Sequence, residues 1–221
     1  MAPGISTVTV PDAVVLDVGG VLVDWDPRHL YRRIFSDPAE MERFLADVCT
    51  PEWHLQHDRG IPYEETIPAL VAAHPDRAAE IRAWGDRFDE MYGGAIRGTV
   101  DLLAALRDRD VPSYASTNWG AESWARAKLA FPFLDWFDGA LVSGEVGISK
   151  PDPAFYALLV ERFALDPSRT FYVEDNEENL RAAGAAGFVT HHFVDPPDLA
   201  AALRDHGLLP PAGDGTTCGR P

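Results

Sequence analysis

Cysteine is scarce in this chain of 221 residues, which contains Cys49 and Cys218 and no other. The two residues lie far apart, and the second is in a tail rich in glycine and proline. They provide neither a disulfide framework nor the ligand set of a structural zinc site. We therefore expect a protein of a reducing compartment, the cytoplasm.

Positive charge is scarce as well, because 19 Lys and Arg stand against 35 Asp and Glu, giving a formal net charge of −16. Such a chain lacks the cationic surface that nucleic acids and anionic membranes attract. No Lys or Arg precedes Arg28, so a secretory signal is not expected, and no apolar run approaches the ~18 residues of a membrane span. We expect a soluble monomer or homodimer that binds neither nucleic acid nor membrane.

The composition that remains, 46% hydrophobic and 24% charged, is that of a globular protein. Short apolar segments typical of buried strands lie at 13–16, 111–117, 139–143, 169–175 and 189–194. Helical spacing of apolar residues lies between or beside them, at 99–110, 121–130, 152–164 and 178–187. Residues 27–97 show helical spacing throughout, with no convincing strand.

This order predicts an α/β fold in which a parallel, Rossmann-like sheet carries a small helical insertion. We expect residues 10–26 and 98–207 to form the α/β core and residues 27–97 to form the insertion. Residues 1–9 and 208–221 are expected to be loose ends. Right-handed crossovers would bring the carboxyl ends of all strands to one edge of the sheet, where ligands bind in such folds.

Polar side chains stand at three of these strand ends, and a lysine stands in a loop between the last two: Asp17, Thr117, Asn118, Lys150, Glu174 and Asp175. Each has an ordinary explanation alone, as a turn former, a helix cap or a solvated loop charge. Their joint placement at one predicted edge favours a functional site.

The chemistry of this set suits phosphoryl transfer. An aspartate such as Asp17 can attack a phosphoryl group and form an aspartyl-phosphate. Paired carboxylates repel unless a hard cation lies between them, and Mg²⁺ prefers oxygen ligands. Hydroxyl, amide and ammonium groups can bind the non-bridging oxygens of the transferred group.

The same residues resemble the four motifs of the haloacid dehalogenase-like (HAD) superfamily, in order along residues 13–205. LDVGGVL resembles the first motif and STN the second, with Asp17 as nucleophile and Thr117 as phosphate ligand. SKPDP resembles the third motif through Lys150, and VEDNEEN the fourth through Glu174 and Asp175. The helical segment 27–97 is similar to the family's small helical cap, called C1.

This resemblance implies a Mg²⁺-dependent phosphatase of a small phosphorylated metabolite, a sugar phosphate or similar compound. The implied catalytic residues are Asp17, Thr117 and Lys150. The implied phosphate ligands are Thr117, Asn118 and Lys150, and the implied metal ligands are Asp17, the Gly19 carbonyl, Glu174 and Asp175.

The sequence departs from this family at Gly19, where phosphatases of the family usually carry a second aspartate as general acid and base. A backbone carbonyl still suits a metal there, but the proton transfer is lost, and such transfers are worth ~10²–10⁴-fold in rate. Candidates for a replacement are Asp24, Asp26, His54 and His57, although the two aspartates are equally consistent with a helix start.

The Asp-x-Gly form of the first motif resembles that of bacterial α-D-glucose-1-phosphate phosphatases, and so does the cap segment WHLQHDRGIPYEE. By this resemblance Trp53, His54, His57 and Arg59 are expected to contact the substrate. Trp25 and Trp119 lie beside the motifs and could line a ring of the substrate, although core packing is the commoner use of tryptophan.

Two alternatives remain open on the sequence. One is a 2-haloacid dehalogenase, in which Asp17 attacks carbon and no metal is needed, although dehalogenases of the family lack the paired acid Glu174–Asp175. The other is a catalytically silent binding protein, in which Gly19 records a lost activity. Ligand binding without turnover would identify the second.

Overall fold

The computed structural model describes residues 10–211 and is built on a five-stranded parallel sheet. The strands follow the order β5-β4-β1-β6-β7, and their bounds are Ala13–Leu16 (β1), Ser113–Thr117 (β4), Gly139–Val142 (β5), Thr170–Glu174 (β6) and Val189–His192 (β7). The predicted α/β fold with a parallel sheet is therefore confirmed. Of the predicted loose ends 1–9 and 208–221, residues 1–9 and 212–221 lie outside the described residues.

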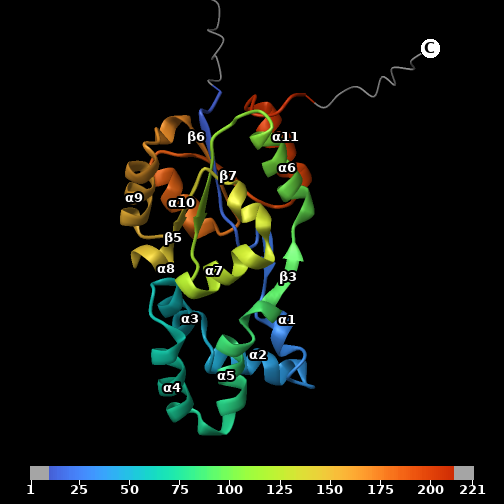
Figure 1. Cartoon of the computed structure of the whole chain (residues 1–221), viewed down its shortest axis with the longest axis vertical. Coiled ribbons are helices and arrows are strands. Elements are labelled where there is room, and N and C mark those ends of the chain that lie inside the picture. Colours follow the sequence, from blue (N-terminus) through green and yellow to red (C-terminus); the bar gives the residue numbers. More distant parts are fainter. Residues whose placement is uncertain (1–9, 212–221) are drawn as a thin grey trace, which may run out of the picture.

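Helices cover both faces of this sheet, which makes three layers (Figure 1). Val14 and Leu16 of β1 pack in one apolar cluster with residues of α6 (Arg97–Arg107), α7 (Ala121–Ala130) and α11 (Pro196–Asp205). Val15 packs on the other face with residues of α9 (Pro153–Phe163) and α10 (Glu177–Ala185). This alternation is what a strand buried on both faces requires. A short helix, α8 (Ser143–Val146), follows β5.

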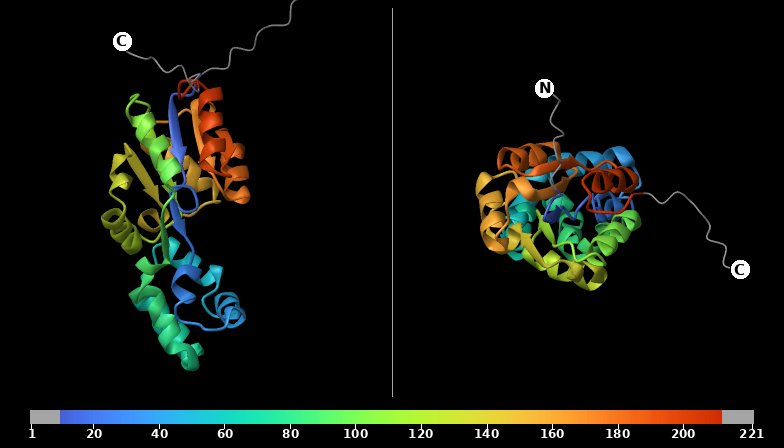
Figure 2. Two further views of the ribbon diagram at one scale, coloured as in Figure 1. Left: turned by 90° about the vertical axis from the view of Figure 1, so that its right-hand side faces the viewer. Right: turned by 90° about the horizontal axis from the view of Figure 1, so that it is seen from above.

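A second group of helices follows β1 and lies beyond the carboxyl edge of the sheet (Figures 1 and 2). Its aromatic core includes Tyr31, Phe44, Trp53, Trp84 and Phe88. The helices of this helical segment are α1 (Arg28–Tyr31), α2 (Pro38–Asp47), α3 (Pro51–Asp58), α4 (Tyr63–Ala73) and α5 (Ala78–Asp86). Short 3-10 helices complete the described chain at Pro75–Arg77, Phe88–Met91, Pro132–Trp136 and Pro167–Arg169.

The expectation that residues 27–97 contain no strand is wrong. The strand β3 (Tyr92–Ala95) pairs antiparallel with β2 (Val23–Trp25), so the two chain crossings between the sheet and the helical segment lie side by side. The sequence of β3 is YGGA, and glycine disfavours a strand. The strand therefore forms because β2 pairs with it, and not because its own residues favour a strand.

The carboxyl-terminal boundary of the packed chain also differs slightly from prediction. Leu208 and Leu209 were expected in a loose end, but both are buried in the same apolar cluster as α6 and α11. Among residues 10–211, no helix has the length and apolar character to cross a membrane.

Candidate active site

The polar strand ends meet around one buried lysine. The Lys150 ammonium lies 3.1 Å from Asp17 Oδ1 and 2.6 Å from Glu174 Oε2, and it donates to the Ser116 carbonyl at 3.0 Å. Asp17 follows β1 directly and Glu174 ends β6, the strand beside it, so the sheet order brings the two carboxylates to one lysine. Sequence reasoning had placed these residues at the same edge.

The charges in this cluster are strongly coupled. Burial opposes the charge of Lys150, but Asp17 and Glu174 outweigh burial and hold the lysine pKa well above its ordinary value. Burial would also raise the pKa of Glu174, yet Lys150 lowers it. The pKa of Asp17 is raised well above its usual range by burial and by the charge of Glu174. A single lysine therefore does not compensate both carboxylates.

A third carboxylate, Asp175, completes an acidic cluster. Asp17, Glu174 and Asp175 can each offer an oxygen within 4.8 Å of the others. Burial and the neighbouring Glu174 raise the pKa of Asp175 to about 6. Gly20 makes this approach possible, because its φ is +75° and a Cβ there would lie 2.1 Å from Asp175 Oδ2. Three converging oxygens with excess negative charge are a suitable set for a hard divalent cation.

Asn118 holds the loop that carries the lysine. Its amide nitrogen donates to the Lys150 carbonyl at 2.9 Å, and its Oδ1 accepts from the Lys150 backbone amide at 2.8 Å. Both groups of the Asn118 side chain thus contact backbone, so the geometry gives this residue a positioning role. Thr117, the last residue of β4, is buried beside it.

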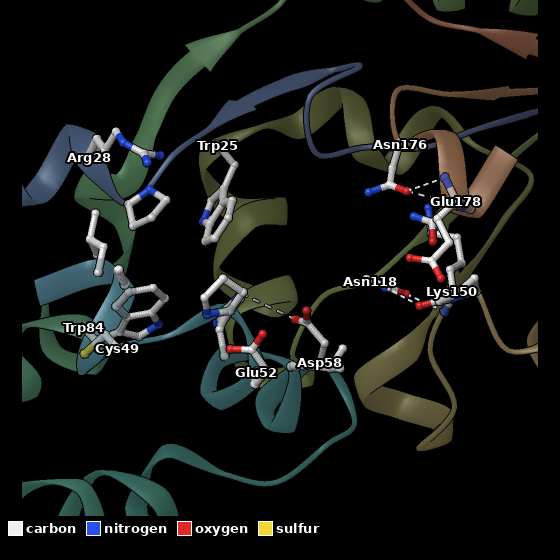
Figure 3. A pocket seen from close by; sticks show the side chains of 18 of the residues that line it. Trp25, Arg28, Cys49, Glu52, Asp58, Trp84, Asn118, Lys150, Asn176 and Glu178 are labelled. Carbon is white, nitrogen blue, oxygen red and sulfur yellow. Dashed lines mark hydrogen bonds and ion pairs between the residues drawn. The ribbon is translucent and has the colours of Figure 1, made fainter. Parts of the chain in front are cut away.

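A cavity of about 850 Å³ opens between this cluster and the helical segment (Figure 3). Asn118, Lys150, Asn176 and Glu178 line it from the α/β side, and Asn176 also caps α10. The facing wall comes from the chain around β2 and from the helical segment. Most of its residues are apolar or aromatic: Trp25, Pro27, Leu45, Ala46, Cys49, Pro51, His54, Leu55 and Trp84. Four charged residues also line it: Arg28, Glu42, Glu52 and Asp58.

Several residues predicted to contact a substrate do not line this cavity. Trp53 packs in the aromatic core, with its ring edge-on to Trp84. His57 uses both ring nitrogens, at 3.0 Å from the Ile61 carbonyl and 3.2 Å from Thr66 Oγ1. Arg59 Nε donates to Ser149 Oγ at 3.2 Å. These three residues join parts of the protein to one another.

The aspartates proposed as replacement acids also lie outside the cavity. Asp24 pairs with His29 at 3.1 Å, and its side chain is 52% exposed. Asp26 accepts from the Arg28 backbone amide at 2.8 Å, as a residue at a helix start does. The helix-start explanation of Asp26 therefore agrees with the structure.

His54 and Trp25 do line the cavity, and their rings stack at 5.0 Å with 14° between planes. Burial lowers the pKa of His54 to about 4, so its ring is neutral at pH 7. Trp119 lines a smaller cavity nearby and otherwise belongs to the core of the sheet.

Sequence reasoning missed Asp58, which is buried in the wall of the cavity. Its Oδ1 lies 3.7 Å from His54 Nε2, one helical turn earlier on α3. The signal was available, because residues four apart share a helix face, and His54 had already been singled out.

The chain is similar to known phosphatases over most of its length. A sesquiterpene phosphatase of Aspergillus oryzae is 28% identical over 193 residues, which cover 87% of this chain and 94% of that protein. A phosphorylated carbohydrates phosphatase of Thermotoga maritima is 24% identical over 86% of this chain and 91% of that protein. The predicted likeness to glucose-1-phosphate phosphatases is not tested by these relatives.

Among solved structures, a HAD family enzyme of Bacteroides thetaiotaomicron in a magnesium complex has a TM-score of 0.70 and 21% identity, covering 89% of this chain and all of that one. At that identity the likeness concerns the fold. The model of the haloacid dehalogenase-like hydrolase family matches residues 11–187, which include the sheet edge with Asp17, Lys150 and Glu174. The chain belongs to the haloacid dehalogenase-like hydrolase family.

Proposed function

We propose that the protein is a Mg²⁺-dependent phosphatase that hydrolyses the phosphate monoester of a small metabolite. One observation carries the proposal: Asp17 lies between a buried lysine and two further carboxylates, at the edge where a cavity opens. The two phosphatases named above, similar over most of the chain, support the same reaction class.

In this proposal Asp17 attacks phosphorus and forms an aspartyl-phosphate, which water then hydrolyses. Lys150 neutralises Asp17 and draws charge from the phosphoryl oxygens, and Thr117 donates to one of them. Asn118 fixes the Lys150 loop through its two backbone contacts. Glu174 holds the ammonium in place from the other side.

Asp17, Glu174, Asp175 and the Gly19 carbonyl would hold Mg²⁺. The fit rests on the three carboxylate oxygens within 4.8 Å. Burial and the charge of Glu174 raise the pKa values of Asp17 and Asp175, and a bound cation would offset both effects. When bound, the cation supplies the charge that ionises Asp17 and attracts the phosphate of the substrate.

The helical segment serves as a cap in this proposal. Its apolar wall would contact the organic part of the substrate, and its packing over the sheet edge would exclude bulk water. Trp25 stacked on His54 offers a flat face, which suits a sugar or another ring with an apolar side.

The test is phosphate release from a panel of monoesters with Mg²⁺ and with chelator, for the wild-type protein and Asp17→Asn. We expect Mg²⁺-dependent release that falls by at least ~10³-fold in the variant, because the nucleophile is lost. Folded protein that binds Mg²⁺ and releases no phosphate would overturn the proposal. Halide release from 2-chloropropionate without metal would instead support a dehalogenase.

A further inference from the structure

A second, smaller cavity of about 100 Å³ lies beside Gly19, two residues after Asp17. Asp58 and His54 line it from α3, and Asn118 lines it from the α/β side. The same three residues also line the large cavity, so Asp58 stands where the two spaces meet. Figure 3 shows its carboxylate on the side of the cavity that faces Asn118 and Lys150.

The end of α3 is held against the α/β core by close packing just after Asp58. Gly60 has a φ of +88°, and a Cβ there would lie 2.7 Å from the Gly144 carbonyl. Arg59 donates to Ser149, the residue before Lys150. Asp58 is thus fixed over the sheet edge although it belongs to the helical segment.

No side chain from position 19 enters the small cavity. An ideal Cβ built on Gly19 meets no atom within 4 Å, and the residue is not among those with positive φ. The space beside Gly19, two residues after the nucleophile, is therefore open to a proton donor from the opposite wall, and Asp58 is the carboxylate that lines it.

Burial favours the protonated form of Asp58 near neutral pH. Burial raises its pKa to about 7, and the charge of Lys150 opposes part of that rise. His54 is neutral at that pH, because burial lowers its pKa to about 4. On α4, burial and the charge of Asp58 raise the pKa of Tyr63. A carboxyl group with a pKa near the working pH is suited to transfer a proton in both directions.

We propose that Asp58 is the general acid and base of the reaction, a role that rests on the phosphatase function proposed above. Asp17 Oδ bonds to phosphorus while the bond from phosphorus to the ester oxygen breaks, and the Asp58 proton passes to that oxygen to give the alcohol. Asp58 then takes a proton from water as the water oxygen bonds to phosphorus. The bond from phosphorus to Asp17 breaks, and both carboxyl groups return to their starting states.

The dependence on the leaving group tests this role. An alkoxide needs a proton as it leaves, whereas 4-nitrophenolate is stable without one. For Asp58→Asn we expect kcat/KM on ethyl phosphate to fall by at least ~10²-fold, and on 4-nitrophenyl phosphate by less than ~5-fold. The fall of wild-type activity on ethyl phosphate above pH about 7 should disappear in the variant. The control is Asp86→Asn. Asp86 is exposed and is the last residue of α5, as Asp58 is the last residue of α3, and this variant should keep wild-type rates.

A second variant tests the geometry by rescue. Position 19 has room for a side chain. The double variant Asp58→Asn, Gly19→Asp should therefore have a kcat/KM on ethyl phosphate at least ~10-fold higher than that of Asp58→Asn alone. Equal losses on the two esters in Asp58→Asn, with no rescue, would overturn the role of Asp58 and leave the phosphatase function intact. A wild-type protein that hydrolyses neither ester would overturn both.

Discussion

The two walls of the cavity are built on opposite principles. On the α/β wall, Lys150 and Asn118 have their polar groups paired at hydrogen-bond distance, Lys150 with the buried Glu174 carboxylate that does not itself line the cavity. On the helical wall, indole nitrogens of Trp25 and Trp84 and the Nδ1 of His54 are buried without a partner. The first wall is organised around a buried ion pair, whereas the second is mostly aromatic and apolar, with Arg28, Glu42, Glu52 and Asp58 as its charged residues.

This difference separates two tasks. Charge must be fixed and compensated where the reaction occurs, because an unpaired buried charge is costly. The surface that receives an organic group needs shape and little charge. Asp58 is the buried acid of the helical wall, where Glu42 and Glu52 are exposed, and burial raises its pKa. Three substitutions test this difference between the two walls.

The largest expected effect is that of Lys150→Met on stability. The change leaves Asp17 and Glu174 buried without a counter-charge, which should cost about 3–5 kcal/mol of unfolding free energy. The matched control is Lys128→Met, which breaks an exposed ion pair with Asp135 at 2.7 Å and should cost at most ~1 kcal/mol of unfolding free energy. Urea unfolding at pH 7 measures both, and similar losses in the two variants would contradict the description of the charged wall.

A smaller effect is expected from Asp58→Asn on the pH dependence of stability. The folded-state pKa of Asp58, about 7, lies above that of the unfolded chain, near 3.8. The folded state therefore binds this proton more tightly, and wild-type stability should decrease as pH rises from about 4 to 7. The variant lacks that decrease. Its free energy of unfolding, relative to that of the wild type, should therefore rise by roughly 1–4 kcal/mol between pH 4 and pH 8.

Unfolding at a series of pH values measures this difference, and other titrating groups cancel because both proteins contain them. The Asp86→Asn variant, in which the changed residue is exposed, should follow the wild-type curve. If the curves of Asp58→Asn and wild type run parallel, burial does not raise the pKa of Asp58. The assignment of Asp58 as a proton donor would then lose this support.

The smallest effect is expected at the apolar wall. Trp25→Ala removes the flat face stacked on His54, so KM for 1-naphthyl phosphate should rise by about 10-fold, or ~1.4 kcal/mol, while KM for ethyl phosphate changes little. The control is Trp136→Ala, whose ring lies near Arg107 and not in the cavity. A similar rise in KM for both esters would show that Trp25 shapes the site as a whole and does not recognise a ring.

The sequence determined the charged wall. Apolar runs that end in Asp17, Thr117 and Glu174 predict buried parallel strands, and parallel strands bring their carboxyl ends to one edge. Local pattern is enough there, because each residue is placed by the strand it terminates. Lys150 was found for the same reason, since its loop joins α8 to α9 at that edge.

Tertiary structure alone decided the opposite wall. Which residues of α3 face the cavity depends on how that helix packs on α5 and on the loops at Gly60 and Gly144, and these contacts join residues far apart in the sequence. His57 and Trp53 therefore pack inside the protein, whereas Asp58 lines the cavity. The pairing of β3 with β2 is of the same kind, because a glycine-rich segment becomes a strand where the crossing partner supplies its hydrogen bonds.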